Sequence, residues 1–266
     1  MKIDHCGMTD VGRKREKNED SFLINEKLGL FVVADGMGGH LGGECASRLA
    51  VTTLEEILRQ VEEDPDATVM GDQPINLGDF SDRLKYGIRV ASSRIFEEAM
   101  RNPSLRGMGT TSVVLLVQGE KGYVANVGDS RAYLIRAGTI RQITSDHSLV
   151  NEQIQAGFIS KKDARHHRLK NIITRSVGFQ EEVETDVQVH ELQPADCILL
   201  CSDGLTNLIE DREILRIVGR CTSSRTACER LIEAANKKGG DDNITTIIVR
   251  FEGEPDLSRV TLPKKA

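Results

Sequence analysis

The order of strand-like and helix-like segments most constrains the fold of this chain. Short apolar runs typical of strands come in consecutive groups, and long amphipathic stretches separate the groups. A doubly wound parallel sheet would need strands and helices that alternate singly. We therefore predict an α+β fold, in which a two-sheet core carries helix pairs on its outside.

Apolar residues at helical spacing predict helices over residues 46–61 and 84–99, and two further helices over 212–218 and 225–237. The stretch between the first two, residues 62–82, is polar and rich in turn residues, which is typical of a loop.

The predicted strands are short and end at turn residues. They are residues 21–25 and 30–34, which form a hairpin-like pair; 111–117, 123–127, 131–135 and 139–143, which form an antiparallel meander; and the apolar runs 196–201 and 244–249. The polar residues 148–170 are expected to form a flap or a small helical insertion.

Charge and composition exclude several classes of protein. The chain has 35 basic and 41 acidic residues, so its net charge of −6 argues against a nucleic-acid binder. No run of about 18 apolar residues predicts a membrane segment. The first ten residues lack the apolar core of a signal peptide, and we expect a cytoplasmic protein. Six cysteines without a C-x-x-C pair predict buried thiols and no zinc site.

Four aspartates stand where apolar strand-like runs end or begin. Asp35 and Asp203 each follow such a run and precede a glycine, Asp129 follows a third run, and Asp242 directly precedes a fourth. A single aspartate at a strand end usually belongs to a turn, because its side chain bonds its own backbone. Four of them, at the ends of strands that share a core, predict a cleft in which carboxylates converge.

Such a cleft favours a particular kind of metal ion. Carboxylates within a few ångströms of one another repel, so they take up protons or bind cations. No thiolate or histidine cluster accompanies them, and ligation by oxygen alone favours Mg²⁺ or Mn²⁺. The glycine after Asp35 allows close approach of the backbone, so the carbonyl of Gly36 is a further candidate ligand.

Two more segments bear on the chemistry. Residues 13–20 (RKREKNED) are most simply a solvated turn, but an arginine beside a divalent metal cluster is suited to hold a phosphate. The glycine-rich residues 36–43 lack the spacing of a nucleotide-binding P-loop. Neither a nucleophile elbow nor a cysteine with a histidine partner supports covalent catalysis.

Short motifs follow one another in a recognisable order over residues 4 to about 250. They are TDVG at 9–12 with Arg15 and NED at 18–20, VADGMGGH at 33–40, GTT at 109–111, NVGDSRA at 126–132, SDHS at 145–148, TRSVG at 174–178, LCSDGL at 200–205 and DDNIT at 241–245. Together these motifs resemble those of the PPM family of metal-dependent protein phosphatases (type 2C), in particular its bacterial branch.

The resemblance implies two stacked antiparallel sheets flanked by helix pairs, an α-β-β-α sandwich. It implies a single catalytic domain at residues 1–252, with the flap at about 148–170 and a polar C-terminal tail at 253–266. It also implies a binuclear Mg²⁺/Mn²⁺ centre. Asp35 would bridge the two ions, Asp203 and Asp242 would hold one of them, and the Gly36 carbonyl would hold the other.

Further roles follow from the same resemblance. Glu19 and Asp20 would act largely through metal-bound waters, and Arg15 would bind the phosphate. Asp129 with Asp203 would form a third metal site beside the flap, as in bacterial members. A water activated by the two ions would attack phosphorus in line, without a phosphoenzyme.

The general acid is the point at which the sequence departs from the eukaryotic members. They carry a histidine directly after Asp-Gly, and here that position is Met37. His40 and a water on the third ion are candidate substitutes, although His40 could equally cap the following helix. We expect His147 to lie outside the ligand set.

The predicted activity is hydrolysis of phosphoserine and phosphothreonine in proteins. The expected partners are phosphorylated proteins, a eukaryotic-like Ser/Thr kinase that the enzyme opposes and the targets of that kinase, with a monomer as the default state. A narrower alternative is a phosphatase dedicated to one regulatory protein. Another is a pseudophosphatase that acts as a binding module, but such proteins usually lose metal-binding aspartates. The flap is expected to contact substrate.

Overall fold

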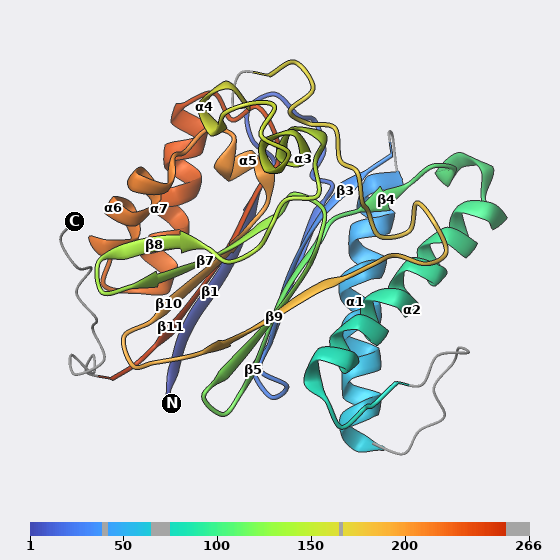
Figure 1. Ribbon diagram of the computed structural model, residues 1–266, viewed down its shortest axis with the longest axis horizontal. Coiled ribbons are helices and arrows are strands. Elements are labelled where there is room, and N and C mark those ends of the chain that lie inside the picture. Colours follow the sequence, from blue (N-terminus) through green and yellow to red (C-terminus); the bar gives the residue numbers. More distant parts are fainter. Residues whose placement is uncertain (39–41, 65–74, 165–166, 254–266) are drawn as a thin grey trace.

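A computed structural model describes residues 1–38, 42–64, 75–164 and 167–253 of the chain. Two antiparallel sheets lie face to face, and helices cover the outer face of each sheet (Figure 1). The predicted α+β sandwich is thus confirmed. His40 and residues 254–266 of the predicted tail lie outside the described residues.

One sheet contains the first and the last of the described strands. Its strands, in spatial order, are β1 (Ile3–Asp10), β11 (Ile244–Phe251), β10 (Cys197–Cys201), β7 (Arg131–Arg136) and β8 (Thr139–Gln142). Strand β11 pairs with β1 on one side and with β10 on the other, so residues from both ends of the sequence lie side by side in this sheet.

The other sheet contains the predicted hairpin. Its strands, in spatial order, are β2 (Asp20–Asn25), β3 (Leu30–Met37), β5 (Ser112–Gln118), β6 (Lys121–Val127) and β9 (Asp186–Glu191), and the short β4 (Gly109–Thr110) pairs with the end of β3.

Within the described ranges the helices form two pairs and three shorter pieces. The pairs are α1 (Gly42–Glu63) with α2 (Phe80–Arg101), and α6 (Asp211–Gly219) with α7 (Ser224–Lys237); the shorter ones are α3 (Leu149–Gln155), α4 (Lys161–Ala164) and α5 (Asp203–Thr206), besides a 3-10 turn, η1 (Pro103–Leu105). The helices α3 and α4 lie within the predicted flap. Among the described residues, no helix is both long and apolar enough to cross a membrane.

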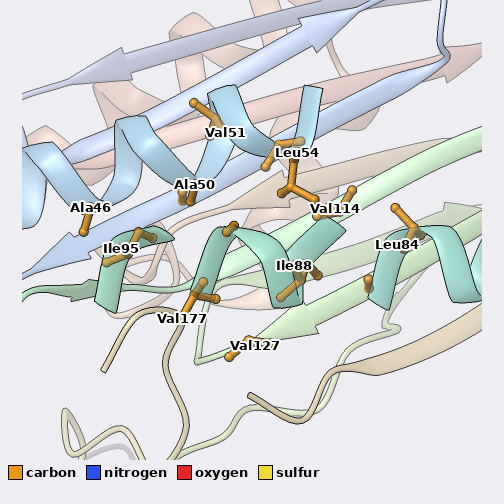
Figure 2. Packing of buried hydrophobic residues seen from close by; sticks show 14 of the residues in the cluster. Ala46, Ala50, Val51, Leu54, Leu84, Ile88, Ile95, Val114, Val127 and Val177 are labelled. Carbon is orange, nitrogen blue, oxygen red and sulfur yellow. The ribbon is translucent and has the colours of Figure 1, made fainter. Parts of the chain in front are cut away.

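Strand β3 shows how the layers are held together. Its residues Leu30 and Val32 pack in the cluster formed by α1 and α2, whereas Phe31 and Val33 pack in the cluster between the two sheets. Successive side chains of a strand point to opposite faces, so a strand covered on both faces is a continuous apolar run. Figure 2 shows the first of these clusters, to which α1 contributes residues such as Leu54.

The predicted meander was wrong at one point that matters for the site. Strands β5 and β6 pair with each other, and β7 pairs with β8, but β6 and β7 belong to different sheets. Between them the chain turns at Gly128, whose φ is +100°, a conformation that favours glycine. The chain therefore passes from one sheet to the other at Asp129.

Strands β1 and β9 were not predicted at all. Each is an edge strand of its sheet, and each mixes polar with apolar residues (IDHCGMTD and DVQVHE). Most of their residues are partly exposed, so they lack the apolar run that identified the central strands.

Candidate active site

The predicted aspartates meet at one end of the sandwich. Asp20 begins β2 and pairs with Asp35 near the end of β3. In the other sheet Asp203 follows β10 and Asp242 precedes β11, and these are neighbouring antiparallel strands. Asp129 lies in the turn that crosses between the sheets. Strand ends from both sheets thus bring five carboxyl groups to one region.

Asp20 is one of the buried side chains of this group. Its Oδ2 accepts hydrogen bonds from Ser202 Oγ (2.8 Å) and Thr245 Oγ1 (2.6 Å). Its other oxygen, Oδ1, is buried and has no hydrogen-bond partner. A buried carboxylate oxygen without a partner is costly, so this atom is suited to a water or an ion.

Burial and mutual repulsion raise the pKa values of the group. Burial raises the pKa of Asp20 to about 7, and the charges of Asp203 and Asp242 add to the effect. The pKa of Asp35 lies well above its ordinary value, first because of burial and then because of the charge of Asp20. Burial likewise raises the pKa of Asp129, with the charge of Asp203 as the next cause. The site therefore favours bound protons or cations.

Asp35 is held in place by its backbone. Its N–H donates to Thr111 Oγ1 (2.9 Å), and its carbonyl accepts from Thr111 N (2.8 Å) and from Thr110 Oγ1 (2.9 Å). At Gly36, a Cβ atom would lie 2.1 Å from the carbonyl oxygen of Gly43. The backbone can come this close only because both strand and helix carry glycine here.

The loop that carries Arg15 and Glu19 is fastened to the start of β11. The side chain of Asn243 donates to the carbonyls of Val11 (3.0 Å) and Lys17 (2.9 Å) and accepts from Glu19 N (2.8 Å). The guanidinium of Arg15 contacts Asp242 at 2.7 Å and is half exposed, so a cationic group lies beside a predicted metal ligand.

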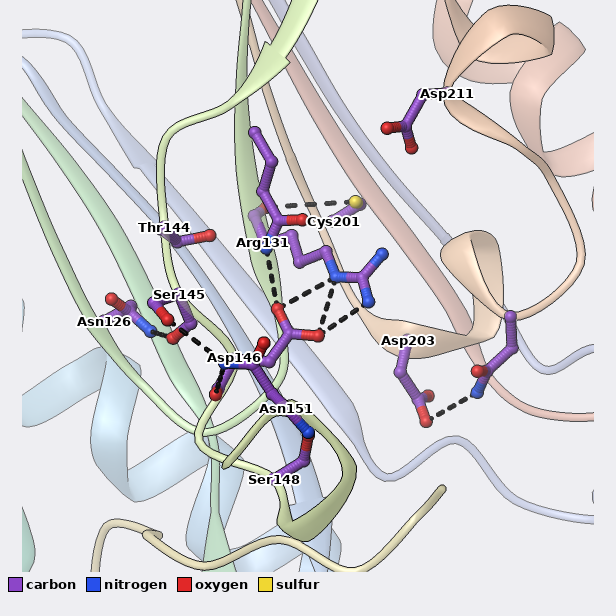
Figure 3. Close-up of polar contacts among 12 residues, drawn as sticks. Asn126, Arg131, Thr144, Ser145, Asp146, Ser148, Asn151, Cys201, Asp203 and Asp211 are labelled. Atoms are coloured by element: carbon purple, nitrogen blue, oxygen red, sulfur yellow. Dashed lines mark hydrogen bonds and ion pairs between the residues drawn. The ribbon is translucent and has the colours of Figure 1, made fainter. Parts of the chain in front are cut away.

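An ion pair supports the Asp129 side of the site (Figure 3). Arg131, at the start of β7, donates to Asp146 Oδ1 from Nε (3.0 Å) and to Asp146 Oδ2 from Nη2 (2.6 Å). The charges of both Asp146 and Arg131 act on Asp129, in opposite directions. Nearby, Asp203 Oδ2 accepts a hydrogen bond from Asn207 (2.9 Å), which orients one face of that carboxylate.

The oxygen atoms of the acidic cluster are of the kind that a hard divalent ion binds. They are carboxylate oxygens, one of them buried and unpartnered, beside a backbone approach that only glycine permits. As placed, no three acidic, histidine or cysteine side chains within the described ranges stand close enough together to enclose one ion. Side-chain rotation would have to draw the carboxylates inward onto a shared ion.

The remaining predicted residues divide into those the structure places and those it does not. His147 is buried and contacts Gly128 and Asp186. His40 falls between the described ranges.

Sequence reasoning missed the polar residues that hold the acidic ones. Ser202, Thr245, Asn243 and Thr111 are all buried and bond the aspartates or their loops. Each belongs to one of the recognised motifs. Ser202 and Asn243 are next to Asp203 and Asp242 in sequence, Thr245 follows Asp242 by three residues, and Thr111 ends the GTT motif. A buried polar residue beside a strand-end aspartate was the available signal.

A cavity of about 540 Å³ lies elsewhere, between α2 and residues 182–185. Its lining includes Tyr86, Arg89 and Glu184, and none of the clustered aspartates. We place the chemistry at the carboxylates, because unpaired buried charge is stronger evidence of a reactive site than volume.

Comparison with known proteins identifies the family of the chain. The protein phosphatase 2C family matches residues 5–244. The serine/threonine phosphatase stp of Listeria monocytogenes is 39% identical over 257 residues, which cover 94% of this chain and 95% of that protein. Protein phosphatase PhpP of Streptococcus pneumoniae is 36% identical over 250 residues, which cover 93% and 97%.

Solved structures show the same fold. The crystal structure of the Mycobacterium tuberculosis serine/threonine phosphatase PstP/Ppp matches with a TM-score of 0.83 at 33% identity, covering 94% of this chain and 99% of that one. The catalytic domain of PstP in complex with two manganese ions matches with a TM-score of 0.80 at 33% identity, covering 94% and 99%. Sequence, fold and the acidic site together show that the chain belongs to the protein phosphatase 2C family of metal-dependent serine/threonine phosphatases.

Proposed function

We propose that the acidic end of the sandwich is the catalytic centre of this phosphatase. Asp35, the Gly36 carbonyl, Asp203 and Asp242 would hold two Mg²⁺ or Mn²⁺ ions, and Glu19 would act largely through water. Asp20 would do the same. The observation that carries the proposal is the buried, unpartnered Oδ1 of Asp20 among carboxyl groups whose pKa values are raised. Two such ions, when bound, would acidify a water that attacks phosphorus.

The protein's own groups orient the phosphate and manage its charge. Arg15 contacts Asp242 through Nη2, and half of its side chain is exposed. It can therefore turn N–H groups toward two phosphoryl oxygens, which match its planar fork. Asn243 keeps the loop of Arg15 at this distance from the ligands.

The proton for the departing serine or threonine oxygen needs a donor. Met37 has no proton to give, so His40 and a water near Asp129 and Asp203 remain the candidates. Asp129 and Asp203 lie close enough that the charge of each bears on the acidity of this region. We propose that together they form a third, weaker ion site.

The biological setting extends beyond the site. We propose that residues 1–252 form one catalytic domain, that the flap at 148–170 contacts phosphoprotein substrates, and that the enzyme opposes a Ser/Thr kinase in the cytoplasm of a bacterium as a monomer. The names of the relatives in Listeria and Streptococcus support the bacterial setting.

Phosphate release from a phosphothreonine peptide, with Mn²⁺, with Mg²⁺ and with EDTA, tests the proposal. Asp203→Ala removes a ligand, and Asp79→Ala, which removes the cap of α2 far from the cluster, is the matched control. We expect release that depends on the metal and is lost only in Asp203→Ala. Folded protein without release in either metal would instead favour a pseudophosphatase.

A further inference from the structure

His147 and Gly128 are joined by two hydrogen bonds. The backbone N–H of His147 donates to the Gly128 carbonyl (2.9 Å), and the backbone N–H of Gly128 donates to Nδ1 of the His147 imidazole (3.1 Å). Gly128 precedes Asp129 in the turn between the two sheets. A Cβ at Gly128 would lie 2.6 Å from the Thr111 side chain, so the turn has little room to shift. His147 thus fixes the backbone from which Asp129 projects.

The other side of the imidazole faces β9. Because Nδ1 accepts a hydrogen bond, the ring proton of a neutral His147 lies on Nε2. Nε2 is 3.3 Å from Asp186 Oδ2, and Arg175 Nη1 donates to the other oxygen of Asp186 at 3.0 Å. Burial lowers the pKa of His147, which favours this neutral form. One ring therefore connects the Asp129 turn with Asp186 and Arg175.

Both ends of the flap meet at the same histidine. We name residues 147–149 and 172–174 the flap stems. Thr174 N donates to the His147 carbonyl (2.9 Å), and Leu149 N donates to the Ile172 carbonyl (2.9 Å). Arg175, which contacts Asp186, directly follows the second stem.

The described part of the flap has little apolar packing of its own. Val150 and Ala164 are its buried apolar residues, whereas Phe158 is 80% exposed. Segments with few buried apolar contacts open locally at low free-energy cost. The hydrogen bonds of the stems, rather than a core, must therefore determine how the flap is held.

We propose that His147 is a positioning residue that couples the flap stems to the Asp129 turn. His147 positions Asp129 through Gly128, and it holds the flap stems through Asp186. Ordering of the flap stems therefore favours ordering of the Asp129 turn, and the reverse. The proposal rests on the proposed function in taking Asp129 as a ligand of a third ion and the flap as a substrate contact. Coupling of this kind is reciprocal: a phosphopeptide that orders the flap should tighten the ion site at Asp129.

Three variants separate the contacts. His147→Ala removes both side-chain contacts. His147→Asn can place Oδ1 where Nδ1 accepts from Gly128 but cannot reach Asp186. His190→Ala is the matched control, because His190 is a half-buried histidine of β9 whose Nε2 has no hydrogen-bond partner. A melting curve of each variant shows whether it is folded.

The first measurement is amide hydrogen exchange in EDTA, which does not depend on activity. We expect exchange in both stems to rise on the order of tenfold in His147→Ala, as befits the loss of a buried hydrogen bond, and less in His147→Asn. His190→Ala should leave the stems unchanged. Unchanged protection of the stems in His147→Ala would overturn the proposal. If that variant does not fold, Asp186→Asn provides the same test at the outer end of the ring.

The second measurement compares two substrates at varied Mn²⁺. In His147→Ala we expect on the order of tenfold lower kcat/KM on a phosphothreonine peptide, a higher half-saturating Mn²⁺ concentration, and a smaller loss on a small aryl phosphate. His147→Asn should recover the Mn²⁺ dependence more than the peptide preference. Equal losses on both substrates, with unchanged Mn²⁺ dependence, would contradict the coupling. An inactive wild type would instead defeat the proposed function and leave the exchange result standing.

Discussion

Strand β7 carries an arginine–aspartate ion pair at each of its ends, and the two pairs serve different purposes. Arg131 binds Asp146 at the acidic end, and Arg136 binds Asp196 at the opposite end. In both pairs the shortest contact is 2.6 Å, and the arginine uses Nε and Nη2. Chemistry and geometry alone would not tell them apart.

The surroundings of the two ion pairs distinguish them. Asp196 also accepts from Gln193 N (2.7 Å), and Arg136 donates to the Glu191 carbonyl (2.7 Å), so this pair closes the turn between β9 and β10. Asp146 lies instead at the entrance to the flap, and its charge acts on Asp129. We therefore expect the pair at Asp196 to matter for stability and the pair at Asp146 to matter for activity, because only the second acts on the buried carboxyl group of Asp129.

The largest expected effect is at the acidic end. We expect Asp203→Asn to lower phosphate release by on the order of a thousandfold, because it removes a predicted ligand of the catalytic ions. In EDTA the same variant should melt at a higher temperature than wild type, since one of several repelling carboxylates is gone. Steady-state kinetics and thermal melts measure both. A lower melting temperature in EDTA would show that the carboxylate is structural.

At the opposite end of β7, substitution of Asp196 should lower stability and leave activity nearly unchanged. Asp196→Ala leaves the Arg136 guanidinium and the Gln193 N–H without their acceptor. We expect a loss of about 2–3 kcal/mol in the free energy of unfolding, below the range for a fully buried pair because Arg136 is 34% exposed. Urea denaturation measures the loss. Activity per folded molecule should stay within about twofold of wild type, and a large loss would break the comparison.

Stability should depend on pH in a direction set by the acidic cluster. The raised pKa values of Asp20 (about 7) and Asp35 mean that the folded protein without metal holds protons that the unfolded chain releases. This contribution is full below the ordinary carboxyl pKa and is lost as pH rises through the folded value. In EDTA we expect the melting temperature to fall by several degrees between about pH 5 and 8, and Mn²⁺ to reverse the fall. A melting temperature that rises over this interval would contradict the repulsion.

The smallest effect sharpens the comparison directly. Asp146→Asn keeps the shape of the side chain but no longer neutralises Arg131 beside Asp129. We expect a threefold to tenfold loss of activity, roughly, with a loss of stability of about 1–2 kcal/mol, because the pair is largely buried and asparagine keeps one acceptor oxygen. The same exchange at Asp196, as Asp196→Asn, should change stability more than activity. Kinetics and urea denaturation of Asp146→Asn and Asp196→Asn, measured in parallel, test this difference. Equal changes in activity and stability in both variants would show that the two ion pairs have the same role.

Much of this site could be predicted from the sequence, because aspartates that follow apolar runs must lie at strand ends. The structure brings Asp20, Asp35, Asp129, Asp203 and Asp242 to one end of the sandwich, and Arg15 beside them. The ligand roles of these residues are predictions that the experiments above test.

What could not be predicted were the partners across the fold. The passage of the chain between sheets at Gly128 looks, in sequence, like one more tight turn of a meander. The link from Asn243 to Lys17 joins residues 226 positions apart, and no local pattern encodes it. Edge strands β1 and β9 lacked a signal because half-exposed strands need no apolar run.

The place of β11 between β1 and β10 has a consequence for the making of this enzyme. On the ribosome β1 is synthesised long before β11, which is its neighbour in the sheet among the described strands. The sheet with β2, β3, β5, β6 and β9 can assemble while translation continues, but the other must wait for release of the C-terminal strand. Asp242 lies two residues before the start of β11. We therefore expect the acidic cluster to stay incomplete on the nascent chain until β11 has been synthesised.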